Sequence, residues 1–109
     1  MSDLSNNIQI SYLYRDSGNY KLFGEVIFSN PENISMEFIE TSIQSILIEG
    51  LYFIAEKWNL PKLEFEVFNK QMDHPWHEFE MVEHTAYEPT DSRSITEFVT
   101  EIIKIQPGV

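Results

Sequence analysis

The segment MDHPWHEFEMVEH, residues 72–84, gathers the side chains of this chain that are best suited to chemistry. It holds all three histidines of the sequence, His74, His77 and His84, beside Asp73 and three glutamates. Imidazole nitrogens and carboxylate oxygens bind zinc and similar divalent metals, and a catalytic site uses about three such ligands. The composition of the segment therefore suggests a metal site, with Asp73, His74 and His77 as candidate ligands.

The spacing of the histidines gives this metal hypothesis little support. His74 and His77 flank a Pro-Trp pair, whereas the HExxH motif places its two histidines on one face of a helix. If residues 77–84 form a strand, His77 and Glu78 point to opposite faces of the sheet. His84 then lies about 23 Å from His77 along an extended chain, too far for a shared metal ion.

The same segment also has a purely structural interpretation. Asp73 and Pro75 are residue types that favour turns. Trp76 would then cover the edge of the core, and His77 would begin the following strand as a polar residue. The sequence leaves a metal-dependent enzyme and a structural turn as alternatives for these residues.

Other enzyme classes lack the residues that they need. The chain contains no cysteine, which excludes thiol nucleophiles, disulfides and Cys-type zinc sites. It has only four glycines and neither a GxSxG turn nor a glycine-rich phosphate loop. Glu64 could pair across two strands with Glu78 or Glu80, but general acid catalysis needs a desolvated carboxyl, and we expect these residues on an open face. We therefore expect no cofactor, and we rank a binding function above an enzymatic one.

The net charge of the chain disfavours some classes of binding partner. Eighteen acidic residues against seven basic ones give a net charge of −11, which repels nucleic-acid phosphates and anionic lipid surfaces. We expect neither nucleic acid nor a membrane as a direct partner. Residues 64–101 hold ten acidic residues against two basic ones, a net charge of −8. Such a concentration attracts a basic protein, although acidity on this scale also serves solubility alone.

The length of 109 residues predicts a single domain over residues 1–109, because chains this short seldom divide into two cores. Eight Phe, five Tyr and two Trp supply enough apolar surface for a core without disulfides or structural metals. No apolar run approaches the roughly 18 residues that a membrane span needs, and the N-terminal residues do not resemble a signal peptide. We expect a cytoplasmic protein.

The first half of the chain predicts a hairpin followed by a helix. Residues 8–15 alternate apolar and polar side chains in the manner of a strand, and the Asp-Ser-Gly-Asn run at 16–19 favours a turn. Residues 20–30 predict the second strand. Ser35 can cap a helix over residues 36–47, whose apolar positions form one stripe.

The second half predicts a similar arrangement. Residues 51–61 predict either a short strand from Tyr52 to Ala55 or a packed loop. Residues 63–68 and 77–84 alternate again and predict a second hairpin. In the latter strand, Phe79 and Met81 are expected to face the core, and Val82 and His84 the opposite side.

A closing helix completes the expected fold. Ser94 and Glu97 have the spacing of a capping box before apolar residues at helical intervals up to Ile103. The predicted fold class is α+β, with the order ββα-ββα, one optional extra short strand, and an antiparallel sheet whose two helices pack on one face.

The face of the sheet that the helices leave uncovered is the predicted binding surface. Six carboxylates are expected on it or beside it: Glu64, Glu66, Glu78 and Glu80, with Asp73 and Glu83 at the margins. The leading hypothesis is a binding module of the inhibitor or immunity type, which docks a basic partner on these carboxylates.

The first hairpin adds an apolar group to the same face and suggests a different function. Leu13, Phe23 and Ile27 are expected there among polar neighbours. A homo-oligomeric structural protein joined through these three residues is therefore a further alternative.

Overall fold

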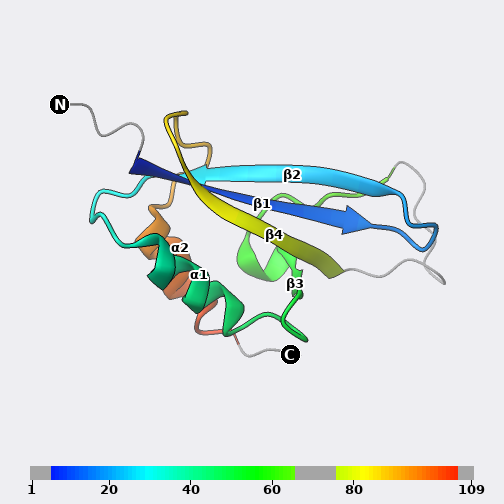
Figure 1. Cartoon of the computed structure of the whole chain (residues 1–109). Helices are drawn as coiled ribbons and strands as arrows, with labels where there is room; N and C mark the ends of the chain where they lie inside the picture. Colours follow the sequence, from blue (N-terminus) through cyan, green and yellow to red (C-terminus); the bar gives the residue numbers. More distant parts are fainter. Residues whose placement is uncertain (1–5, 66–75, 106–109) are drawn as a thin grey trace.

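A curled, four-stranded antiparallel sheet in the order β2-β1-β4-β3 organises the chain, and both helices lie on one side of it (Figure 1). This computed structural model describes residues 6–65 and 76–105. The elements are, in chain order, β1 (Asn7–Arg15), β2 (Lys21–Phe28), α1 (Met36–Gln44), β3 (Tyr52–Ile54), the 3-10 helix η2 (Ala55–Trp58), β4 (Trp76–Thr85) and α2 (Ile95–Ile102). The α+β architecture with its antiparallel sheet confirms the predicted fold class.

The N-terminal hairpin forms as predicted. Asp16 closes its turn, because its Oδ1 accepts hydrogen bonds from the backbone N–H groups of Gly18 and Tyr20, both at 2.9 Å. Asn19 adopts the left-handed conformation, with φ at 69°, which Asn tolerates better than most residues. One face of β1 is buried and consists of Ile8, Ile10, Tyr12 and Tyr14.

Both predicted helices begin at their predicted caps. The Ser35 hydroxyl accepts a hydrogen bond from Phe38 N at the start of α1. Ser94 and Glu97 form a complete capping box at the start of α2. The helix α1 ends before the predicted Leu47, but Leu47 is still buried in the core. Neither helix of the described part is long and apolar enough to cross a membrane.

The connection after α1 contains the extra short strand. β3 pairs with β4 at the edge of the sheet, and η2 follows it directly. Trp58 of η2 is buried and stacks on Phe53 of β3, with the ring centroids 4.4 Å apart. This stacking fixes the short strand and the 3-10 helix to the core, because aromatic pairs bury large areas in defined geometries.

The predicted second hairpin is observed only in its second strand. Residues 61–65 belong to no strand, and the remainder of the predicted partner strand, residues 66–68, lies outside the described residues. Within the described ranges, β4 pairs with β1 on one side and with β3 on the other. The prediction of a strand beginning at Leu63 is therefore wrong for its described part.

Packing against the core explains why residues 61–65 leave the sheet. Burial raises the pKa of Tyr12 to about 12, so its hydroxyl stays protonated and donates to Pro61 O at 2.6 Å. A Cβ added at Gly24 would lie 3.0 Å from Leu63 Cδ2. The absence of a side chain at this glycine therefore leaves room for Leu63 on the buried side of the sheet. The segment therefore covers the buried side of β1 and β2.

A β-bulge in β4 changes which side chains face outward. Ser11 pairs with Met81, and the next residue of β1, Tyr12, pairs with Phe79. Glu80 is therefore an extra residue without a partner in β1. One inserted residue reverses the facing of every residue beyond it, because side chains alternate with a period of two.

The predicted facing of β4 is consequently wrong beyond the bulge. Met81, which was expected in the core, is exposed on the side away from the helices. Val82, which was expected on that side, is buried opposite Ile10. His84 pairs with Ile8 and so belongs to the helix side of the sheet, although its side chain is exposed at the end of the strand.

Candidate functional site on the open sheet face

The side of the sheet away from the two helices, termed the open face, carries the candidate site. Residues directly opposite each other in an antiparallel pair point to the same side, so the register defines which side chains share this face. Its side chains around the candidate site are Phe23 and Glu25 of β2, Gln9 and Ser11 of β1, and Met81 and Glu83 of β4, with Glu80 at the bulge.

Two carboxylates from different strands converge above β1. Gln9 Nε2 donates to Glu25 Oε2 at 3.1 Å and to Glu83 Oε2 at 3.3 Å, so one neutral amide bridges two negative groups. Glu80 is exposed beside them and helps to line an open hollow of about 340 Å³ with Ser11, Phe23, Gly24 and Glu25. Glu25, Glu80 and Glu83 together are called the acidic row.

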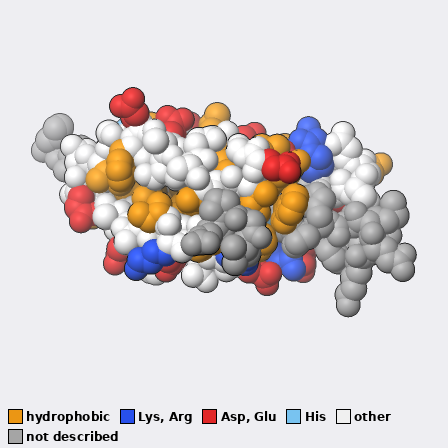
Figure 2. All heavy atoms as spheres, turned by 90° about the horizontal axis from the view of Figure 1, so that it is seen from below, with side chains coloured by type: hydrophobic (Ala, Val, Ile, Leu, Met, Phe, Trp, Pro, Cys, Tyr) orange, Lys and Arg blue, Asp and Glu red, His pale blue; other side chains and the backbone are white. Residues whose placement is uncertain are grey.

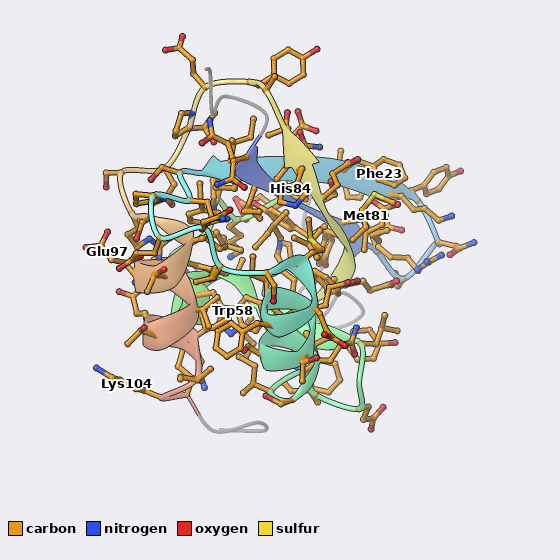
Figure 3. The ribbon with its side chains drawn as sticks, turned by 60° about the vertical axis from the view of Figure 1, so that its left-hand side comes forward. Phe23, Trp58, Met81, His84, Glu97 and Lys104 are labelled. Atoms are coloured by element: carbon orange, nitrogen blue, oxygen red, sulfur yellow. The ribbon has the colours of Figure 1, made fainter. Side chains whose placement is uncertain are left out.

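Two large apolar side chains flank the acidic row. Phe23 is 64% exposed and Met81 is 47% exposed. Figure 3 shows the two residues near each other at the sheet, whereas Trp58 lies down among the helices. Exposed apolar groups beside charged ones are typical of contact surfaces for other proteins.

The other two residues of the predicted apolar group are buried. Leu13 pairs with Phe23 and also with Glu78, and its side chain is covered on the open face. Ile27 is held at the end of β2 by the loop that follows β4, where Thr90 N donates to Ile27 O at 2.8 Å. Of the predicted oligomer contacts, only Phe23 is presented to the outside.

Glu78 lies on the open face but is neutralised within the chain. It is buried, and Arg15 donates to both of its carboxylate oxygens, from Nε at 2.8 Å and from Nη2 at 3.2 Å. The hydrogen bond to Glu78 raises the pKa of Arg15 further above its usual value. This paired geometry makes Glu78 a fixed part of the sheet and leaves its charge unavailable to a partner.

The remaining predicted carboxylates lie elsewhere. Glu64 is exposed in the irregular segment after Pro61 and forms a surface ion pair with Lys62 at 3.4 Å. Glu66 and Asp73, and with them the candidate metal ligand His74, lie outside the described residues. The structure thus brings Glu80 and Glu83 of the predicted set together and adds Glu25, which was placed on this face but not among the binding residues.

His77 is a core residue. It is only 1% exposed, its Nε2 accepts a hydrogen bond from Leu63 N at 2.9 Å, and its ring contacts those of Tyr12, Tyr14 and Phe53. This bond occupies one of the two ring nitrogens and fastens the segment after Pro61 to β4. Within residues 6–65 and 76–105, no three His, Asp or Glu side chains are grouped as metal ligands.

Arg93 has a structural role that the sequence analysis did not assign. Its guanidinium donates to both oxygens of Asp91 at 3.0 and 2.8 Å, to Glu101, and to the carbonyls of Trp58 at 3.1 Å and Asn59 at 2.8 Å. The hydrogen bond from Arg93 lowers the pKa of Asp91. Its place as one of two basic residues in the acidic stretch 64–101 was the one available signal.

The surface seen from below, where the helices lie, differs from the open face. Figure 2 shows acidic and basic side chains around its margin, with hydrophobic side chains between them. The acidic row, in contrast, forms no ion pair with a basic side chain in the part of the chain that the structure describes. Its negative charge is therefore directed to the outside.

The open face presents a serine, carboxylates and exposed apolar groups. Ser11 Oγ accepts from Gln9 Nε2 at 3.4 Å, and neither described histidine, His77 or His84, shares this face, so Ser11 is not paired with a base. Carboxylates and exposed apolar groups can bind a cationic protein surface without any reaction. Comparison of the chain with known protein families, curated proteins and solved structures found no match.

Proposed function

We propose that this protein is a cytoplasmic binding module that docks a basic protein on its open face and neutralises it, in the manner of an inhibitor or immunity protein. The observation that supports this proposal best is the convergence of Glu25 and Glu83 on the single amide of Gln9. Two carboxylates held by one neutral donor gain from a nearby cation, since like charges across strands destabilise a sheet.

The neighbouring apolar side chains give the proposed interface its centre. Phe23 and Met81 are the exposed apolar groups beside the acidic row. Aromatic residues and Met are enriched in protein interfaces, where buried apolar anchors supply most of the affinity and charges around them select the partner. The expected partner surface therefore carries Lys or Arg side chains around an apolar depression.

Several other carboxylates already have structural partners. Asp16 caps a turn, Glu97 completes the capping box of α2, and Asp91 is paired with Arg93. Glu37 and Glu40 of α1 are also exposed, and they offer a second acidic surface for comparison. A test of the proposal must therefore separate the acidic row from acidity in general.

Two double variants with the same change in charge make this separation. E80K/E83K reverses the acidic row, and E37K/E40K reverses the outer surface of α1. Tagged wild-type protein and both variants are used to capture basic proteins from lysate at low salt, followed by elution at high salt and mass spectrometry. We expect wild type and E37K/E40K to retain the same basic protein and E80K/E83K to lose it by at least about tenfold, because rim charges steer and select partners. Equal capture by the two variants would contradict the proposal.

A further inference from the structure

Among the described residues, the outer edge of β2 has a short stretch whose backbone groups form no hydrogen bond. β2 is an edge strand of the sheet, and at its end the backbone of Ile27 bonds outward to Thr90 and Asp91. Outward-pointing backbone groups recur at every second residue of a strand, so those of Lys21, Phe23 and Glu25 also point away from β1. No described residue bonds to them there.

The charges of this stretch are complementary to those of a second copy that runs in the opposite direction. Its outward residues are a cation, an aromatic ring and an anion, at Lys21, Phe23 and Glu25, with the ring in the middle. We propose that β2 pairs antiparallel with β2 of a second copy about a two-fold axis at Phe23. Lys21 then lies opposite the partner's Glu25, and Phe23 lies opposite the partner's Phe23.

This register satisfies the backbone as well as the side chains. With Phe23 on the axis, each of the three outward residues faces an outward residue of the other copy, so the pair forms about six N–H to C=O bonds. On the helix side of the sheet, Leu22 lies opposite the partner's Gly24, against which Leu63 of that copy packs. The free edge is bounded by the hairpin turn at one end and by the Ile27 contacts at the other, and the two-fold pairing uses its whole length.

The charges of the edge favour this occupant. Within its own sheet Lys21 lies opposite Arg15, a like charge that is already bound to Glu78. Lys21 forms no ion pair among the described residues. Opposite charges directly across an antiparallel pair stabilise it and like charges destabilise it, so the partner's Glu25 supplies what the chain itself does not.

The proposed dimer goes beyond the proposed function and does not rest on it. A two-fold axis perpendicular to an antiparallel sheet leaves both open faces on the same side. The two acidic rows would then lie on one continuous surface of eight strands, with the two Phe23 rings at its centre. A monomeric protein could still bind a basic partner, and a dimer could form without one.

Charge exchange at the edge tests the pairing. Sedimentation velocity measures the dimerisation Kd of wild type, E25K, K21E and the exchanged variant K21E/E25K, with circular dichroism as the control for folding. In E25K both cross-strand pairs join two lysines, and in K21E they join two glutamates, so we expect each single change to weaken the dimer at least about tenfold. The exchanged variant restores opposite pairs and should recover a Kd within a few-fold of wild type.

E25K separates specific pairing from general repulsion between two acidic chains. The substitution lowers the negative charge of each copy, which starts at −11. If overall repulsion governed association, E25K would strengthen the dimer, whereas edge pairing predicts that it weakens it. A wild-type protein that stays monomeric at all concentrations, or a dimer that E25K leaves unchanged or strengthens, would overturn the proposal.

A single introduced cysteine gives an independent test of the axis. The protein has no cysteine of its own, so any intermolecular disulfide in F23C must join two copies at residue 23. Hydrogen-bonded antiparallel residues have Cα atoms about 5.5 Å apart, which a disulfide can span. F23C should therefore oxidise to a covalent dimer much faster than M81C, a control that is exposed on the same face but two strands away from the edge. Equal oxidation rates would contradict the two-fold axis at Phe23.

Discussion

Replacement of Arg93 should destabilise the whole domain, because this side chain joins three parts of the chain. It binds Asp91 in the loop after β4, the carbonyls of Trp58 and Asn59 at the end of η2, and Glu101 on α2. The guanidinium also lies over the ring of Phe98, 5.2 Å from its centroid. The two carbonyls would otherwise end the 3-10 helix without a partner.

The expected loss follows from the bonds and from their burial. The Arg93 side chain is 16% exposed and that of Asp91 is 14% exposed, so water replaces the lost contacts only in part. A hydrogen bond to a charged group contributes about 1.5–3 kcal/mol, and removing one partner of a buried pair costs about 3–5 kcal/mol. We expect R93M, which keeps the apolar contact with Phe98, to lower the free energy of unfolding by about 3 kcal/mol, a large part of the roughly 5–15 kcal/mol of a typical domain.

Urea unfolding at pH 7 measures this loss as a lower midpoint at an unchanged slope. R93K keeps the positive charge but lacks the planar guanidinium with its several N–H donors. We therefore expect R93K to lose about half as much stability as R93M. A loss of less than about 1 kcal/mol in R93M, or equal stability of R93K and wild type, would refute the proposed role of the guanidinium.

Four further outcomes are expected. Because Arg93 lowers the pKa of Asp91, this pair stabilises the fold above the unfolded pKa of about 4 and loses its effect as the pH falls through the lower folded pKa; the stability difference between wild type and D91N, followed by urea unfolding, should shrink steadily below about pH 4. H77F keeps a ring in the core but leaves Leu63 N without its acceptor, so urea unfolding should show a loss of about 1–3 kcal/mol, and an unchanged midpoint would contradict the structural role of His77. Zinc should not raise the melting temperature, because His77 Nε2 is already bonded; a rise that is absent in H77F would restore the metal hypothesis for this segment. Deletion of Glu80 should remove the bulge and leave a regular strand with Met81 outward and Val82 inward, with a change within about 1–2 kcal/mol in thermal unfolding, whereas deletion of Val82 should be far more damaging.

Local patterns of the sequence were enough to predict most elements. The Asp16 to Asn19 turn and the capping box of Ser94 and Glu97 are determined by side chains within a few residues, and both appear where they were predicted. The alternation in residues 8–15 also predicted the buried face of β1 correctly. In each case the physical cause lies within the segment itself, which is why the sequence reveals it.

The errors come from contacts between distant segments. Nothing near Leu63 indicates that the segment turns away from the sheet to lie over Gly24 and to donate its backbone N–H to His77. The bulge at Glu80 depends on pairing with β1, and it reverses the facing of Met81 and Val82. Long-range packing decides these features, so alternation alone misassigned them.

The structure shows which of the carboxylates expected on the open face lie there, and it leaves their role as a binding site a prediction. An acidic surface on the uncovered face of the sheet was expected, and Glu80 and Glu83 belong to it. Glu78 leaves the set because Arg15, far away in the sequence, neutralises it. Glu25 joins the set through its shared contact with Gln9. Neither change could be read from a single segment, because each depends on which strand lies beside which.

The oxidation rate of Met81 tests the proposed binding face most directly. Met81 is 47% exposed on the open face, whereas Met36 of α1 is half-buried on the helix side and serves as an internal control. Brief exposure to peroxide, followed by peptide mass spectrometry, compares the free protein with its complex with the captured basic partner. We predict that the partner slows oxidation of Met81 several-fold and leaves that of Met36 unchanged; oxidation of Met81 at the same rate in the complex would show that the partner binds elsewhere.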